Sequence, residues 1–235
     1  MAQTFPKMKR ILIPTRSFED WKQLLAKPKL HWKQGFSAMT LARSWEAASS
    51  TGFPPEVAEV LKTGSACGLE GIRFLLAIPE YKVPLAGGVR SSQTDIMVLA
   101  RTLHGLAVIG VEGKVDESFG PKLAQKKAEM SEGFSTRLDS LLKRLELPAK
   151  ISDRIRYQLI HRTASTLIMA EDYNAACAVM LVHSFSPMNK GFNDFEAFAS
   201  LFGVKAEMGR LLFLGKYNGR DLLIAWCQGD QRFRS

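Results

Sequence analysis

Two β-rich runs joined by a very short connection are the feature that most limits how this chain can fold. Residues 94–101 and 106–115 are rich in Val, Ile, Leu and Ala, and Leu103-His104-Gly105 lies between them. Apolar runs of this length around a glycine-containing turn are typical of a β-hairpin. We therefore expect two antiparallel strands whose faces are covered by other elements of the chain.

Helical and strand patterns continue on both sides of this hairpin. Apolar residues at helical spacing predict helices over residues 17–25, 37–49, 54–62, 135–145, 152–172 and 194–202. Apolar runs predict strands over 72–78 and 178–182, and Asn218-Gly219 joins 211–217 to 222–226 in a closing C-terminal hairpin. The order predicts an α/β protein with a mixed central β-sheet flanked by helices, in a single domain over residues 1–235.

The net charge favours a polyanionic partner. Lys and Arg together number 32, Asp and Glu 23, and the formal net charge is +9. A surplus of this size is typical of proteins that bind nucleic acid, although it also aids solubility. The basic residues form no concentrated block, so the charge indicates a class of partner without locating an interface.

Cysteine, histidine and hydropathy patterns restrict the compartment and the metals. Cys67, Cys177 and Cys227 are far apart in apolar surroundings, which predicts free thiols and no cysteine metal site. The four histidines are scattered, so any metal is expected to be a hard cation bound by oxygen. The sequence shows neither a signal peptide nor a membrane-spanning run, and we expect a cytoplasmic protein without membrane association.

Charged residues of the hairpin are predicted to share one face of the sheet. A turn centred on the peptide bond after His104 sets Asp95 opposite Lys114, and the same register sets Met97 opposite Glu112. A slip of one residue would move Glu112 and Lys114 to the other face from Asp95. Two carboxylates and an amine on one face suit a Mg²⁺ or Mn²⁺ site for phosphodiester hydrolysis, with a cross-strand salt bridge as the alternative.

This hairpin resembles the core of the PD-(D/E)XK nuclease superfamily, which carries an acidic residue on one strand and E-x-K on the next. Asp95 and Glu112-Gly113-Lys114 match that pattern, and the order of elements resembles the superfamily core over residues 37–183. The resemblance implies a restriction-endonuclease-like fold and metal-dependent cleavage of nucleic acid, with DNA expected before RNA. It implies that Asp95, Glu112 and Gly113 bind the metal and that Lys114 assists the reaction.

Other parts of the sequence qualify this resemblance. Ser92-Gln93-Thr94 stands where the superfamily has the proline that gives the motif its name. Residues 111–117, 156–163 and 180–185 also resemble a bacterial family of uncharacterised proteins. Two further hypotheses therefore stay open, namely a nuclease fold that binds nucleic acid without cutting it, and a metal-dependent hydrolase of a small phosphorylated molecule.

Flanking elements supply further candidate site residues. Some members of the superfamily add a glutamate from the first helix, which here would be Glu46, with Glu70 and Glu80 as weaker alternatives. Polar residues recur at three- and four-residue steps on the helix expected from residue 152, namely Arg154, Gln158, His161, Arg162 and Ser165. We expect nucleic acid to contact Gln158, His161, Arg162, Lys122 and Lys126, although a solvated helix face would show the same pattern. Cutting both strands of a duplex requires two sites, so we also expect a homodimer.

Overall fold

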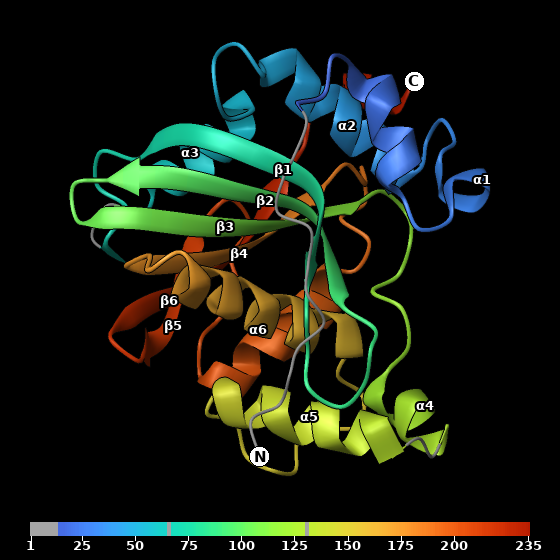
Figure 1. Ribbon diagram of the computed structural model, residues 1–235, viewed down its shortest axis with the longest axis vertical. Coiled ribbons are helices and arrows are strands. Elements are labelled where there is room, and N and C mark those ends of the chain that lie inside the picture. Colours follow the sequence, from blue (N-terminus) through green and yellow to red (C-terminus); the bar gives the residue numbers. More distant parts are fainter. Residues whose placement is uncertain (1–13, 65–66, 130–131) are drawn as a thin grey trace.

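One continuous sheet organises the chain. A computed structural model describes residues 14–64, 67–129 and 132–235, and within them six strands form a sheet in the order β1-β2-β3-β4-β6-β5 (Figure 1). The strands are β1 (Arg73–Val83), β2 (Ser92–Thr102), β3 (Gly105–Lys114), β4 (Cys177–Ser184), β5 (Leu211–Tyr217) and β6 (Arg220–Gln228). β4 runs parallel to β3 and β6, and the other neighbouring strands are antiparallel. The predicted α/β fold with a mixed sheet is confirmed.

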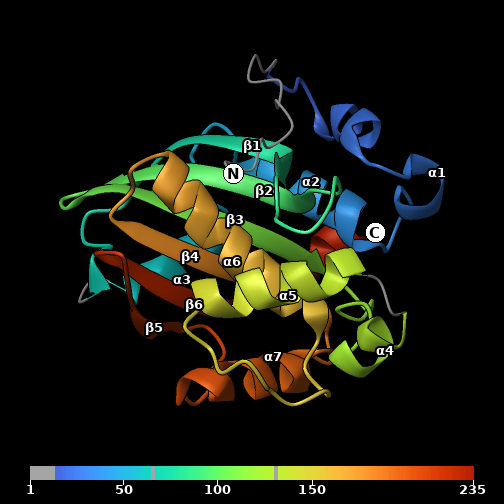
Figure 2. The ribbon, with the colours of Figure 1, turned by 60° about the horizontal axis from the view of Figure 1, so that its bottom comes forward.

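Helices cover both faces of this sheet. One face packs against α2 (Ser37–Ala48) and α3 (Pro55–Lys62), and the other against α5 (Glu132–Arg144), α6 (Tyr157–Asp172) and α7 (Phe192–Ala199) (Figures 1 and 2). The shorter elements are η1 (Phe18–Leu24), α1 (Pro28–His31), α4 (Leu123–Ala128), η3 (Ser200–Phe202) and η4 (Gln231–Arg234). Throughout the described part of the chain, no helix has both the length and the apolar character needed to cross a membrane.

Alternation along β3 decides which side chains meet α6. Val108 belongs to the core between the sheet and α6, whereas Ile109 and Val111 belong to the core between the sheet and α2. Successive strand residues point to opposite faces, so Glu112 and Lys114, which share the parity of Val108, lie on the α6 face. The hairpin therefore presents its charged residues to α6, the third described helix after it in the sequence.

The hairpin register differs from the predicted one by two residues. Thr102 pairs directly with Gly105, so the turn holds only two residues, and the ladder ends at Ile96 opposite Val111. The Thr102 hydroxyl shortens the turn by donating to the Gly105 carbonyl and accepting from the backbone of His104. Continued by one step, this register sets Asp95 opposite Glu112. A shift of two residues preserves the face of every side chain, so the predicted juxtaposition survives.

Strand β1 is longer than the sequence predicts. Pro79 was expected to end it, yet the strand continues to Val83, and Pro79 pairs with Ile96 of β2. β1 lies at the edge of the sheet, where proline is tolerated because no strand on the outer side needs the backbone N–H that it lacks. The extension carries Glu80 past the point where the prediction stopped.

Helix α6 begins five residues later than predicted. Ser152 was expected to cap it, but the helix starts at Tyr157, whose backbone N–H donates to the Pro121 carbonyl. Arg156 forms an isolated antiparallel bridge with Lys122, and the carbonyls of Asp153 and Ile155 accept from the first two residues of α4. These contacts hold residues 153–156 extended or in a turn, so Arg154 is not part of the helical stripe.

A buried histidine joins the sheet to the two helices on its α2 face. His183 of β4 is fully buried, its Nδ1 accepts from the Trp45 indole at 3.2 Å, and its Nε2 lies 3.0 Å from the Glu56 carboxylate. An indole N–H only donates, so Nδ1 carries no proton and Nε2 donates to Glu56. Burial lowers the pKa of His183 against the opposing effect of Glu56, and the neutral ring is the folded form.

This arrangement predicts a stability loss in mild acid. The unfolded chain protonates His183 at a higher pH than the folded chain does, so it binds more protons and unfolding becomes easier as pH falls below about 6.5. His183→Gln should flatten the pH dependence of the unfolding free energy between pH 8 and 5 by up to ~1.4 kcal/mol per pH unit, the limit for one proton. Urea unfolding measures this, with the exposed His104→Gln as the control. Equal pH profiles for both variants would contradict the assignment.

Candidate active site

Two glycines of β3 let helices approach the strand closely on both faces. A Cβ on Gly110 would lie 2.3 Å from the Thr166 hydroxyl of α6, and one on Gly113 would lie 2.9 Å from the Leu41 side chain of α2. Any side chain at these positions would push a helix away. The missing Cβ at Gly110 keeps α6 near enough to β3 for polar side chains of the helix to reach Glu112.

Glu112 is the centre of a buried polar cluster. Its side chain is 3% exposed, and one carboxylate oxygen accepts from Lys114 at 2.6 Å and from Gln158 at 2.7 Å. The other oxygen accepts from the Arg162 Nε at 2.5 Å. Lys114 also donates to the Gln158 carbonyl oxygen at 3.2 Å, and its ammonium lies over the Phe119 ring at 5.0 Å. Three donors from β3 and α6 thus hold one carboxylate away from water.

Asp95 lies beside this carboxylate but is less enclosed. One Asp95 oxygen accepts from the Gly113 backbone N–H at 2.8 Å, where the hairpin ladder ends. The other oxygen lies 3.8 Å from the nearest guanidinium nitrogen of Arg162, beyond hydrogen-bond range. The Asp95 side chain is 23% exposed, so this oxygen can take a further ligand.

Glu80 of β1 is the third acidic residue of this cluster. It lies between Pro79 and Tyr81, which pair with Ile96 and Thr94, so it stands opposite Asp95 in the sheet. Its carboxylate accepts from the Gln93 amide at 2.7 Å. Its φ of +53° is unusual for a residue with a side chain and carries a cost of order 1 kcal/mol. The strained conformation sits at the one β1 position that faces Asp95.

The pKa values of the Glu112, Asp95 and Glu80 carboxyl groups differ widely. Burial raises the pKa of Glu112, but Arg162 and Lys114 outweigh that effect and bring it to about 2. Burial and the charge of Glu112 raise the pKa of Asp95 to about 7, and burial and the charge of Asp95 raise that of Glu80 to about 8. Around neutral pH Glu112 is ionised, Glu80 is mostly protonated and Asp95 is partly protonated, because burial and then the neighbouring negative charge disfavour the ionised forms of the latter two.

A short relay connects the cluster to a neighbouring hollow. The Ser92 hydroxyl accepts from Arg162 at 2.9 Å and lies 3.0 Å from the His161 Nδ1. Ser92 and His161 both line a cavity of about 520 Å³. Burial and the nearby charge of Arg162 lower the pKa of His161 well below its usual value, so its ring is neutral. The cluster is therefore connected to the surface through neutral hydrogen-bonding groups.

The structure gathers most of the predicted hairpin and helix residues and leaves out the others. Asp95, Glu112, Lys114, Gln158 and Arg162 meet in one cluster, and His161 joins it through Ser92. Sequence reasoning assigned Ser92 no role, because nothing local marks a strand's first residue as a partner for α6.

Glu46 lies elsewhere. It is on α2, across the sheet from α6, and its carboxylate accepts from Trp21 at 2.7 Å and from Thr15 at 2.6 Å. The structure does not bring it to the cluster, and Glu80 occupies the position of an additional carboxylate instead. Glu80, predicted only as a weaker alternative to Glu46, reaches this position because β1 continues past Pro79.

The predicted lysines lie near α4. Lys126 pairs with Glu129 and lines the cavity, and the Lys122 backbone donates to the Gln125 side chain at the start of α4. The positive charge of Lys126 is therefore partly compensated within the protein.

Two acidic residues of this cluster carry oxygen atoms of the kind that a hard divalent cation prefers, although among the described residues no group of three or more His, Cys, Asp or Glu side chains is placed to hold a metal ion. Asp95 offers one oxygen without a hydrogen bond, and the Glu112 oxygen bound to Arg162 retains a second acceptor position. Asp95, whose pKa is raised by burial and by the charge of Glu112, would release a proton on binding a cation. Gly113 follows Glu112 directly, so its backbone carbonyl is a third candidate ligand. Arg162 already neutralises part of the charge, so a cation would share these oxygens with the guanidinium.

Comparison with known proteins gives a family for the whole described region. A family model, described as a domain of unknown function (DUF6946), matches residues 14–231. The chain belongs to this family. No curated protein and no solved structure matches it. The family match covers all six strands and every helix that contributes to the cluster, so the site is built entirely within the matched region.

Removing Arg162 should be far more costly than removing an arginine from a surface pair. Arg162→Met leaves Glu112 without one of its charged partners, and breaking a buried pair costs about 3–5 kcal/mol. Arg144→Met, which breaks a half-exposed pair with Glu171, should cost at most ~1 kcal/mol. Urea unfolding compares the two, and the double variant Arg162→Met with Glu112→Gln should recover part of the loss. Similar losses of unfolding free energy for Arg162→Met and Arg144→Met would contradict the importance of the Arg162–Glu112 pair.

Proposed function

We propose that this protein is a metal-dependent nuclease of the PD-(D/E)XK type that hydrolyses phosphodiester bonds in nucleic acid, DNA in preference to RNA. The observation that carries the proposal is the meeting of Asp95, Glu112 and Lys114 on one sheet face, where one Asp95 oxygen stays open to a ligand. A salt bridge alone requires no third carboxylate, yet Glu80 adds one to the same face. Acidic groups collected at this density suit a cation.

In this proposal the hairpin supplies both the metal ligands and the group that guides water. Asp95, Glu112 and the Gly113 carbonyl would hold Mg²⁺ or Mn²⁺, which would supply charge neutralisation for the phosphate and activation of the attacking water. Water attacks phosphorus and the bond to one ester oxygen breaks. The leaving oxygen takes up a proton, which balances the proton released by the attacking water. Lys114 orients this water and stabilises the charge that develops on the phosphoryl oxygens.

The helix side chains hold these groups in position. Gln158 bonds both Glu112 and Lys114, at 2.7 and 3.2 Å, so it fixes the ammonium relative to the carboxylate. Arg162 bonds Glu112 and Ser92 and faces Asp95, and it can turn toward a substrate phosphate when a metal takes over its role. We assign Gln158 and Arg162 to positioning. His161, Lys122 and Lys126 are the proposed nucleic-acid contacts.

Compartment and assembly belong to the same proposal. Cys67, Cys177 and Cys227 are free thiols, as a reducing compartment permits, and we place the protein in the cytoplasm. A nuclease with one site in each chain needs two chains to cut both strands of a duplex, so we propose a homodimer on DNA.

Conservative variants of the hairpin residues test the proposed chemistry. Asp95→Asn and Glu112→Gln keep the side-chain shape and remove ligand charge, so Mg²⁺-dependent cleavage and thermal stabilisation by Mg²⁺ should both be lost. Lys114→Met should retain the Mg²⁺ stabilisation and reduce cleavage by about 10²–10³-fold, the scale for losing one preorganised charged group. Lys216→Met on the exposed surface of β5 should behave like the wild type.

The assay offers plasmid, linear duplex, single-stranded DNA and RNA, each with Mg²⁺, with Mn²⁺ and with chelator. Absence of metal-dependent cleavage of every substrate would overturn the proposal. Nucleic-acid binding without cleavage would then favour the catalytically silent module. Turnover confined to small phosphate esters would favour the small-molecule hydrolase.

Binding of nucleic acid should depend strongly on salt. The net charge of +9 implies that phosphate contacts dominate affinity, and each contact releases counterions. We expect the affinity for duplex DNA in chelator to fall at least tenfold between 50 and 200 mM salt, as roughly two or more phosphate contacts require. Fluorescence anisotropy measures it, and salt-independent binding would argue against a polyanionic partner.

A further inference from the structure

The cavity beside the cluster is built from four separate parts of the chain. Its volume of about 520 Å³ lies within the range of pockets that enclose a small ligand. The β1–β2 loop forms one wall, and the end of α4 and the first turns of α5 and α6 form the others. Gly87 packs so tightly against α5 that a Cβ there would lie 2.2 Å from the Gly133 carbonyl oxygen. The loop is therefore fixed against the helix, and the cavity is a defined shape.

Two arginines give this cavity an unbalanced positive charge. Arg137 donates to the backbone carbonyls of Ala86 and Gly88, at 2.9 and 3.5 Å, so no carboxylate neutralises it in these contacts. Arg90 is exposed, and within the described residues it takes part in no hydrogen bond or ion pair. The acidic lining residue Glu129 is already paired with Lys126. An anion is the ligand that these side chains would attract.

Aromatic rings occupy the same cavity wall. Phe134 and Tyr157 lie edge to face with centroids 5.1 Å apart, and the Tyr157 ring lies 4.9 Å from that of His161. Phe134 is half-buried and lines the cavity, and the Lys126 ammonium lies 5.7 Å from the centroid of its ring, so a planar ligand would share this ring with Lys126. Guanidinium groups next to aromatic rings are the combination that binds a phosphate and a base together.

The position of this cavity connects it to the proposed chemistry. Ser92 lines the cavity and bonds Arg162, and Asp95 lies three residues further along β2, which is about 10 Å in a strand. We propose that the cavity binds one nucleotide of the cleaved strand next to the scissile phosphate, with its phosphate on Arg90 and Arg137 and its base against Phe134. This proposal rests on the proposed nuclease function and adds where the strand lies.

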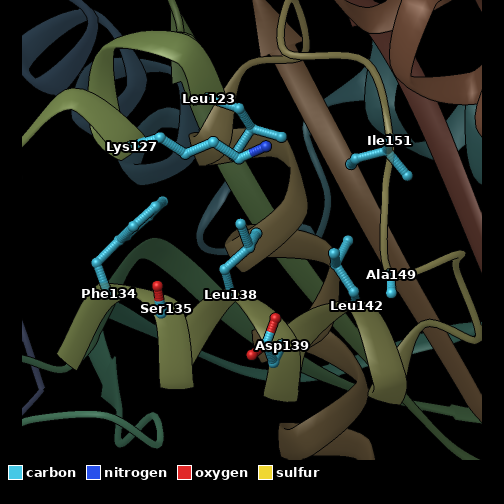
Figure 3. A pocket seen from close by; sticks show the side chains of 9 residues that line it. All are labelled: Leu123, Lys127, Phe134, Ser135, Leu138, Asp139, Leu142, Ala149 and Ile151. Carbon is cyan, nitrogen blue, oxygen red and sulfur yellow. The ribbon is translucent and has the colours of Figure 1, made fainter. Parts of the chain in front are cut away.

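A second hollow nearby has different chemistry. Its volume is about 210 Å³, and aliphatic side chains of α4, α5 and the segment before α6 surround it (Figure 3). Its basic lining residue, Lys127, pairs with Asp153 at 2.5 Å. This hollow therefore offers a phosphate no uncompensated cation, in contrast to the larger cavity with Arg90 and Arg137.

The test measures binding of deoxyadenosine 5′-monophosphate to the full chain by calorimetry in chelator, where cleavage plays no part. We expect the nucleotide to bind at least tenfold more tightly than deoxyadenosine or inorganic phosphate alone. Arg90→Gln should weaken it about tenfold, the scale of one charge-assisted hydrogen bond, and Phe134→Leu by roughly fivefold or more through lost stacking. Arg101→Gln is the matched control, because Arg101 is also exposed and lies near the end of β2 that is remote from the β1–β2 loop carrying Arg90.

Several results would overturn the nucleotide site. One is the absence of nucleotide binding, and another is an equal effect of Arg90→Gln and Arg101→Gln. Inorganic phosphate binding as tightly as the nucleotide would reduce the cavity to an anion site and remove the base from the proposal. Metal-dependent cleavage without nucleotide binding would refute the nucleotide site but not the nuclease function. Nucleotide binding without cleavage would refute the nuclease function but not the nucleotide site.

Discussion

The buried carboxylate of Glu112 is the constraint on which the rest of the site depends. An ionised carboxylate at 3% exposure is stable only if its charge and its lone pairs are compensated, and Lys114, Gln158 and Arg162 do this together. One of these donors comes from β3 and two come from α6. The requirement to satisfy one side chain therefore fixes the helix over the strand, and Asp95 and Ser92 are positioned by what remains of the same network.

The sequence identified the hairpin, its charged face and the helix that covers it. Side chains alternate along a strand, so an error of two residues in the register left Asp95, Glu112 and Lys114 on one face. The polar stripe on the helix also indicated Gln158 and Arg162 correctly, although a solvated face has the same spacing. Strand alternation and helix periodicity are local properties, which is why these features could be predicted from the sequence.

The parts that the sequence did not indicate depend on contacts between distant segments. Helix α6 starts at Tyr157 because residues before α4 bond the chain just ahead of it, a contact that no local pattern around Ser152 reveals. Glu80 reaches the cluster only because β1 lies at the sheet edge and continues through Pro79. Glu46 has a suitable place in its helix, but Trp21 and Thr15 take its carboxylate on the far side of the sheet.

Gly110 gives the site a sensitivity that lies outside its charged residues. The Thr166 hydroxyl occupies the volume where a side chain at Gly110 would be, and the same helix carries Gln158 and Arg162 to Glu112. Helix α6 acts as a stiff lever, so a displacement of its middle is transmitted to both side chains nearer its start. A single methyl group at Gly110 would thus shift Gln158 and Arg162 relative to the Glu112 carboxylate, two residues away along the strand, without altering any ionisable group. The spacing between helix and strand is itself part of the chemistry.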